Sequence, residues 1–187
     1  GQCARQLGAS LFQLGALTLH VLGHPLTCHN QFSLGLVHLG LRGKTVLITG
    51  GTGHLGRLVV PRVQAAGYSV TVASRRARVK GLDANVGWAT VDLSTGAGLR
   101  ESLNGIDAIV HAASDVKNTD AADVQGTKRL AEAARDAGAA HLLFVSIVGV
   151  DRIPFPYYQR KLEAERALVD SGAPHSILRA AQFHSFI

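Results

Sequence analysis

Residues 45–56 read Thr-Val-Leu-Ile-Thr-Gly-Gly-Thr-Gly-His-Leu-Gly, a run of β-forming residues that changes abruptly into glycines. The first five are β-branched or apolar, which is typical of a buried strand. Beyond the glycines, apolar residues recur at helical spacing as far as Ala66, and Gly67 ends the pattern. A strand, a glycine turn and a helix in this order form the first unit of a parallel sheet that helices cover.

The same alternation of strands and helices continues to the end of the chain. Further strands are predicted at 69–73, 86–91, 108–111, 141–146 and 176–179, and helices at 54–66, 98–103, 121–137 and 158–171. This rhythm predicts an α/β fold over residues 43–187, a Rossmann-type doubly wound parallel sheet with helices on both faces. Pro61 lies inside the first helical pattern, where we expect a kink. Because the chain ends on two apolar residues soon after a strand, we expect a C-terminal truncation that leaves out a substrate-covering segment.

Residues 1–42 differ in composition from the rest of the chain. They contain no Asp or Glu and are rich in Leu, Gly and His. No apolar run approaches the ~18 residues that a membrane span requires, and no signal-peptide pattern stands out. The histidines and the two cysteines, Cys3 and Cys28, match no metal-ligand spacing, so we expect no metal site. We therefore expect a poorly ordered N-terminal extension of unknown role.

Net charge and cysteine usage limit the classes of partner and compartment. The chain carries a net charge of +6, but its only basic cluster is Arg75, Arg76, Arg78 and Lys80. A cluster this short suits one phosphate group better than a nucleic-acid backbone, so we expect no nucleic-acid partner. The absence of cysteine after Cys28 fits a reducing compartment, and we expect a cytoplasmic protein without a membrane segment.

The glycine turn has the spacing of a dinucleotide-binding loop. Gly50 permits a tight turn, Gly53 lets backbone approach a pyrophosphate, and Gly56 lets the helix pack closely on the strand. The first turn of that helix offers N–H groups and a positive dipole end to phosphates. The alternative is that these glycines only make a tight turn. The residues that we expect at the cofactor here are Gly50, Thr52, Gly53, His54, Leu55 and Gly56.

The end of the second predicted strand bears on the choice between NAD and NADP. A residue at this position meets the adenosine ribose, and an acidic one would accept the 2′-hydroxyl of NAD. The chain instead has Ser74, Arg75 and Arg76, with no acidic residue before Asp83. Guanidinium groups suit a 2′-phosphate by charge and by geometry. We therefore expect NADP rather than NAD, unless these arginines are only solvated surface charge.

Two further segments follow predicted strands and are candidate parts of the same site. Asp92, followed by Leu93, either accepts a hydrogen bond from the adenine amino group or caps the next turn. Ala112, Ala113 and Ser114 are small, which lets a dinucleotide lie against their backbone. Ordinary close packing would explain small residues there equally well.

Together these motifs resemble the short-chain dehydrogenase/reductase superfamily in its extended or atypical branch. The resemblance rests on Gly50-x-x-Gly53-x-x-Gly56, on Val91-Asp-Leu93 and on Val110-His-Ala-Ala113. Residues 123–127 look like a helix motif of extended members, in which Asp123 stands where Asn is usual. The stretches 144–149 and 157–161 are similar to NmrA-like NAD(P)H-binding proteins. The resemblance covers residues 43–187.

This resemblance implies roles for three side chains. Tyr157 would be the acid/base at a carbonyl or alcohol, while the nicotinamide handles hydride. Lys161 would hold the nicotinamide ribose and lower the pKa of Tyr157, and Ser146 would orient the substrate oxygen. The alternative makes Tyr157 an interfacial aromatic residue and pairs Lys161 with Glu165. His184 follows the last predicted strand, where it would line the substrate pocket or pack.

Two functions follow from this interpretation. The first is an NADP-dependent oxidoreductase that transfers hydride to or from a small carbonyl, alcohol or quinone-like molecule. The second is a non-catalytic NmrA-like redox sensor that binds the dinucleotide and acts through a protein partner. Both require the dinucleotide, and only the first requires a small-molecule substrate.

Overall fold

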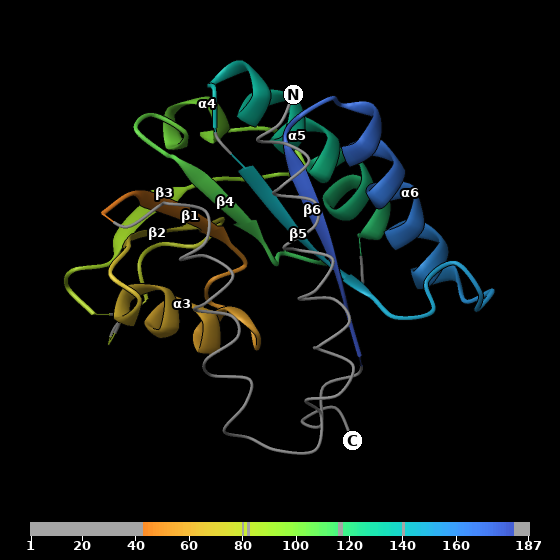
Figure 1. Cartoon of the computed structure of the whole chain (residues 1–187), viewed down its shortest axis with the longest axis horizontal. Coiled ribbons are helices and arrows are strands. Elements are labelled where there is room, and N and C mark those ends of the chain that lie inside the picture. Colours follow the sequence, from red (N-terminus) through yellow and green to blue (C-terminus); the bar gives the residue numbers. More distant parts are fainter. Residues whose placement is uncertain (1–42, 80, 82, 116–117, 140, 182–187) are drawn as a thin grey trace, which may run out of the picture.

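Six parallel strands form one sheet in the order β3-β2-β1-β4-β5-β6 (Figure 1). The computed structural model describes residues 43–79, 81, 83–115, 118–139 and 141–181. The predicted extension 1–42 and His184 lie outside these residues. Within them, the predicted doubly wound parallel sheet is confirmed, because the chain starts at an inner strand and builds outward to both edges.

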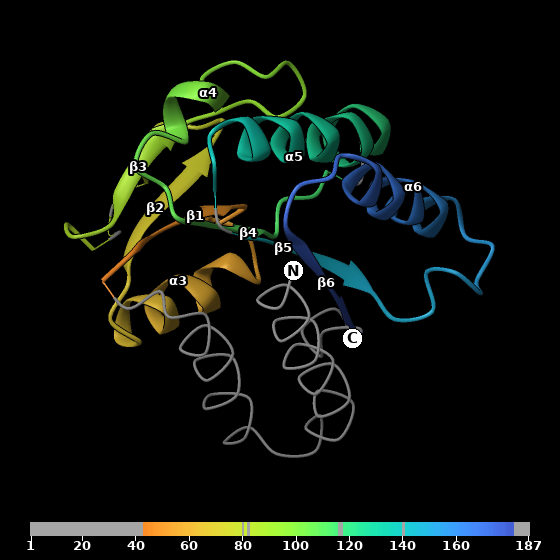
Figure 2. The same ribbon diagram turned by 45° about the horizontal axis from the view of Figure 1, so that its top comes forward.

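The elements fall close to their predicted positions. The strands are β1 (Thr45–Thr49), β2 (Ser69–Ser74), β3 (Gly87–Thr90), β4 (Ala108–His111), β5 (His141–Ile147) and β6 (His175–Ala180). The α-helices are α3 (Gly56–Ala65), α4 (Leu99–Ser102), α5 (Gly126–Asp136) and α6 (Pro156–Asp170), and η2 (Asp120–Gln125) is a π-helix. Figure 2 shows α3 on one face of the sheet and α4, α5 and α6 on the other.

Two details of the helices differ from the prediction. The pattern at 121–137 predicts one α-helix, but its first part is the π-helix η2, and α5 begins only at Gly126. The first helix begins at Gly56 instead of His54, because residues 50–55 form the turn. Helix α3 runs through Pro61 as one continuous element.

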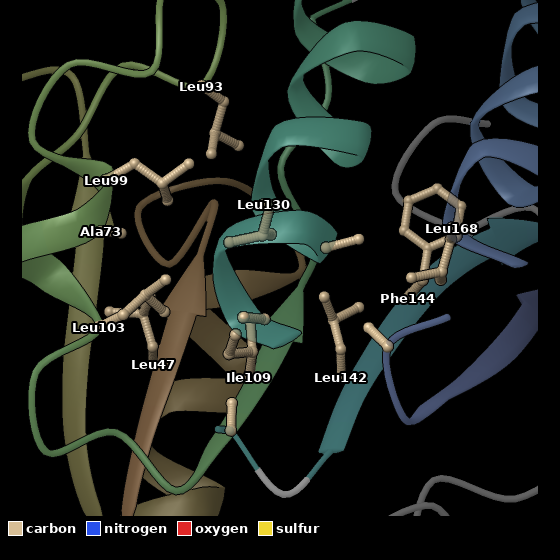
Figure 3. Close-up of a cluster of buried hydrophobic side chains, with 14 of the residues drawn as sticks. Leu47, Ala73, Leu93, Leu99, Leu103, Ile109, Leu130, Leu142, Phe144 and Leu168 are labelled. Atoms are coloured by element: carbon tan, nitrogen blue, oxygen red, sulfur yellow. The ribbon is translucent and has the colours of Figure 1, made fainter. Parts of the chain in front are cut away.

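Each face of the sheet has its own hydrophobic core. Successive strand residues point to opposite faces, so Val46 and Ile48 pack under α3 while Leu47 packs on the other side. On that second face, Ile109 and Phe144 belong to the cluster that α5 and α6 cover (Figure 3). Strands buried on both faces explain the nearly continuous apolar runs of the sequence.

His111, at the end of β4, connects three elements inside the core. Its side chain is fully buried. Its Nδ1 lies 2.6 Å from the Thr49 hydroxyl on β1, and its Nε2 lies 2.9 Å from the Thr127 hydroxyl on α5. Burial, reinforced by the charge of Lys161, lowers the pKa of His111 to about 3. The imidazole is therefore neutral at physiological pH and serves as a structural cross-link.

The low pKa of His111 makes the fold sensitive to acid. The folded-state pKa lies below the ordinary value of 6.5, so protonation below pH 6.5 favours the unfolded chain. The free energy of unfolding should hold above that pH and fall as the pH is lowered towards 3. Urea denaturation should show the wild type losing roughly 2 kcal/mol more between pH 7.5 and pH 5 than His111→Gln. Parallel pH profiles for the two proteins would contradict this assignment.

The glycine turn predicts a second effect on stability. A Cβ on Gly56 would overlap the carbonyl oxygen of Gly50 and lie 2.5 Å from the Cα of Gly51. Backbone cannot move aside as a side chain can, so Gly56→Ala should lower the free energy of unfolding by roughly 1–3 kcal/mol. Gly53→Ala is the matched control, because its Cβ would meet only the Gly50 oxygen, at 3.1 Å. If urea denaturation showed the same loss of unfolding free energy for both variants, the overlap at Gly56 would not be the cause.

Candidate functional site

A cleft of about 270 Å³ lies where β1, β2, β3 and β4 end. The carboxyl ends of parallel strands are where ligands bind in open α/β sheets. The cleft brings together segments that lie far apart in the sequence. Its lining residues are Thr49, Gly50, Thr52, Gly53, Ala73, Ser74, Arg75, Arg76, Val91, Asp92, Leu93, Ser94, Ala112, Ala113, Ser114, Asp115 and Ala122.

Most of the predicted cofactor residues are among those that line the cleft. Four are not. His54 is exposed on the turn, Leu55 is half-buried, and Gly56 is buried at the start of α3. Lys161 is buried on α6.

The glycine turn forms the floor of the cleft. Gly50 has a φ of +72°, and a Cβ there would lie 2.6 Å from the backbone nitrogen of Ala113. Only glycine fits where β1 and the segment after β4 approach so closely. Helix α3 opens from this turn, so the positive end of its dipole faces the cleft. Such an arrangement suits a pyrophosphate.

Basic side chains follow β2 on one side of the cleft. Ser74 accepts a hydrogen bond from the Arg76 backbone N–H at 3.2 Å, and both Arg75 and Arg76 are exposed. The guanidinium of Arg75 lies 3.2 Å from the Asp115 carboxylate. Sequence patterns did not single out Asp115, because the carboxylate enters the cleft from a loop 40 residues further along the chain.

Asp92 follows β3, and its side chain caps the turn formed by the residues directly after it. One carboxylate oxygen accepts hydrogen bonds from the Ser94 hydroxyl at 2.6 Å and from the Ser94 backbone N–H at 2.9 Å. The bond from the hydroxyl holds the pKa of Asp92 below its usual value, and the charge of Arg75 adds to this effect. Of the two roles expected for Asp92, these contacts match the capping of the next turn. Asp92 also lines the cleft.

Tyr157 lies at the edge of the cleft, in the first turn of α6. Its hydroxyl is 2.9 Å from the hydroxyl of Ser114, which lines the cleft. Desolvation raises the pKa of Tyr157, and the negative charge of Asp123 adds to the rise, while the bond with Ser114 opposes it. The resemblance implied that Lys161 lowers this pKa, whereas the net direction is a rise whose largest cause is desolvation.

Lys161, on the same helix as Tyr157, forms a buried ion pair. Its side chain is 4% exposed, and its Nζ lies 3.0 Å from a carboxylate oxygen of Asp123, which is fully buried. The same ammonium lies 4.9 Å from the centre of the Phe144 ring. The alternative pairing of Lys161 with Glu165 is wrong, because Glu165 binds Arg179 at 2.7 Å. The positive charge that would stabilise a phenolate is thus compensated by Asp123.

Ser146, at the end of β5, has a buried hydroxyl. This hydroxyl finds no hydrogen-bond partner among the described residues. Buried polar groups normally have a partner, so an unsatisfied one at a strand's carboxyl end is a candidate for contact with a bound molecule.

Two classes of site are absent from the part of the chain that the structure describes. There, no three histidine, cysteine, aspartate or glutamate side chains gather as metal ligands would. Nor does any helix in those residues combine the length and apolar character of a membrane span.

Comparison with known proteins agrees with this geometry. A family described as NAD(P)H-binding matches residues 50–185. The photosystem II assembly factor Ycf39 of Trieres chinensis is 31% identical over 147 residues, which cover 75% of this chain and 46% of the relative. The (4-alkanoyl-5-oxo-2,5-dihydrofuran-3-yl)methyl phosphate reductase of Streptomyces griseus is 31% identical over 142 residues, covering 75% and 48%. The chain spans about half the length of these relatives.

Solved structures share the architecture. A short-chain dehydrogenase/reductase superfamily protein from Agrobacterium tumefaciens with bound NAD superposes with a TM-score of 0.60 at 28% identity. The match covers 72% of this chain and 48% of that one. The glycine turn, the cleft above it and the family match lead to one conclusion: the chain belongs to an NAD(P)H-binding family of the short-chain dehydrogenase/reductase superfamily.

Proposed function

We propose that the protein is a reductase that binds NADPH in the cleft and reduces a small carbonyl or quinone-like molecule. The observation that carries this proposal is the pair Arg75 and Arg76 at the end of β2, in a chain with no acidic residue before Asp83. An acidic residue at this position would bind the 2′-hydroxyl of NAD, whereas guanidinium groups suit the 2′-phosphate of NADP. A cytoplasmic location is part of the same proposal.

The lining of the cleft supports one orientation of the dinucleotide. In the proposal, the pyrophosphate binds over Gly50 and Gly53 at the start of α3. The adenosine half then extends towards Arg75, and the nicotinamide half extends towards Ser114 and Tyr157. Order along the sheet favours this direction, because β2 and β4 flank β1 on opposite sides.

Tyr157 acts in this proposal as a proton donor. The bound dinucleotide supplies hydride. A tyrosine hydroxyl carries its proton at neutral pH, so it can donate a hydrogen bond to the substrate oxygen. Ser114 orients the Tyr157 hydroxyl at 2.9 Å, and the buried hydroxyl of Ser146 is a second donor to the same oxygen. Negative charge that develops on that oxygen is thereby stabilised.

Lys161 has a different role here from the one that the resemblance implies. Its ammonium is almost fully buried and paired with the Asp123 carboxylate. The pair as a whole therefore has little net charge with which to assist proton transfer. We propose that the pair mainly fixes α6 against η2, and so holds Tyr157 at the cleft. A buried ion pair serves this purpose, because removing one partner would leave an uncompensated buried charge.

The second candidate is a redox sensor that binds the dinucleotide without turning it over and acts through a protein partner. The observation in its favour is the buried ion pair of Lys161 with Asp123, because it leaves no uncompensated ammonium beside Tyr157 to favour a phenolate. The relatives include one protein that is named an assembly factor and one that is named a reductase. A measurement of turnover separates the two candidates.

The cofactor assignment predicts a defined change in affinity. Fluorescence titration of the wild type should give NADPH an affinity roughly 10- to 100-fold above that of NADH, as expected for charge-assisted bonds to one phosphate. Replacing Arg75 by Asp together with Arg76 by Ala should remove this preference and leave NADH binding intact. Arg166→Asp, which changes an exposed charge on α6, is the control and should keep it. An unchanged preference in the double variant would overturn the NADPH assignment.

The proposed chemistry predicts the effect of removing one hydroxyl. Tyr157→Phe should preserve NADPH affinity and reduce NADPH oxidation by about 10²- to 10⁴-fold with a quinone or carbonyl panel. Tyr158→Phe is the matched control, because it removes a hydroxyl from the adjacent ring and should keep the rate.

If no compound of the panel is turned over, the reductase proposal fails. The sensor candidate then requires that the wild type bind NADPH and NADP⁺ with different affinities, and that Tyr157→Phe leave this difference unchanged.

A further inference from the structure

An ion pair crosses the candidate cofactor cleft from one side to the other. The Nη2 atom of Arg75 lies 3.2 Å from the Oδ2 atom of Asp115, and both residues line the cleft. The pair is partly open to solvent, with side chains that are 57% and 21% exposed. Pairs of this kind are weak enough to be exchanged for another partner.

The order of the strands shows what the pair spans. Arg75 follows β2 and Asp115 follows the segment after β4, and β1 lies between these two strands. Two strand spacings amount to roughly 10 Å. Arg75 and Asp115 therefore meet from the two strands that flank β1. While Nη2 of Arg75 holds the Asp115 carboxylate, it is not available to another anion in the cleft.

Asp115 is the anchored member of the pair. Its backbone N–H donates a hydrogen bond to the Oδ2 atom of Asp123 at 3.1 Å. Asp123 is itself fully buried and bound to Lys161. Arg75, in contrast, has a long and mostly exposed side chain, so the exchange of partners takes place by movement of Arg75.

We propose that Asp115 is a specificity-determining residue, which competes with the 2′-phosphate of the cofactor for Arg75. This inference rests on the proposed binding of NADPH. A ligand with a 2′-phosphate must take Arg75 away from Asp115, whereas a ligand with a free 2′-hydroxyl offers Arg75 no equivalent partner. Asp115 therefore lowers affinity for the phosphorylated ligand and limits the preference that the arginines create.

Two small ligands isolate this effect from the nicotinamide half. The first, 2′,5′-ADP, carries the 2′-phosphate, and the second, 5′-AMP, lacks it. By calorimetry on the full chain, Asp115→Asn should raise affinity for 2′,5′-ADP by up to about fivefold and change affinity for 5′-AMP less than twofold. Asp170→Asn removes the same charge from an exposed site at the end of α6 and should change neither affinity.

Combination with Arg75→Gln tests the mechanism. In Arg75→Gln, Asp115 and the 2′-phosphate no longer have a guanidinium to compete for. Adding Asp115→Asn to this variant should therefore change affinity for 2′,5′-ADP less than twofold. An equal gain with and without Arg75 would show that Asp115 acts only by repelling phosphate, and no gain in either background would overturn the inference. Asp115→Ser, measured in parallel, gives the same test if Asp115→Asn does not fold.

The outcomes also separate this inference from the proposed function. Wild type that binds 2′,5′-ADP no better than 5′-AMP would contradict NADPH preference. In that case, a preference that appears on Asp115→Asn still supports the role of Asp115. Wild type that prefers 2′,5′-ADP, with Asp115→Asn unchanged, would retain the proposed function and reject the inference.

Discussion

The close approach of backbone at the glycine turn is the constraint on which the site depends. No Cβ fits at Gly50, which lies against the backbone of Ala112 and Ala113, or at Gly56, which lies against the turn itself. These contacts bring the end of β1, the start of α3 and the segment after β4 to one place. Arg75 and Asp115, which follow the strands on either side of β1, form their ion pair in the same cleft.

A second, buried layer of polar groups supports the cleft from below. His111 joins β1, β4 and α5 as a neutral side chain, while Asp123 and Lys161 join η2 to α6 as ions. The hydrogen bonds of His111 and the opposite charges of Asp123 and Lys161 offset part of the cost of burying these groups in the core. The ionic pair lies four residues along α6 from Tyr157. The contact that packs α6 against η2 is therefore close to the residue that we propose as the proton donor.

Local sequence patterns were sufficient for the sheet and for the glycine turn. Each strand and helix has its own periodicity, and the motif at 50–56 carries its chemistry within seven residues. The contacts that patterns missed join distant segments: Ser114 with Tyr157, Arg75 with Asp115, and Asp123 with Lys161. The π-helix at 120–125 was also missed, because its residues have an ordinary helical pattern that does not distinguish it from an α-helix.

The strand order also has a kinetic consequence. Strand β1 is made first, yet one of its two neighbours, β4, pairs with it across a separation of 62 residues. Non-local pairings of this kind raise contact order and slow folding. During synthesis, one backbone edge of β1 therefore stays uncovered until residues 108–111 have left the ribosome, and an uncovered apolar edge is prone to aggregate. The centre of the sheet, which holds the glycine turn, is therefore complete only after β4 has been made, although β1 is made much earlier.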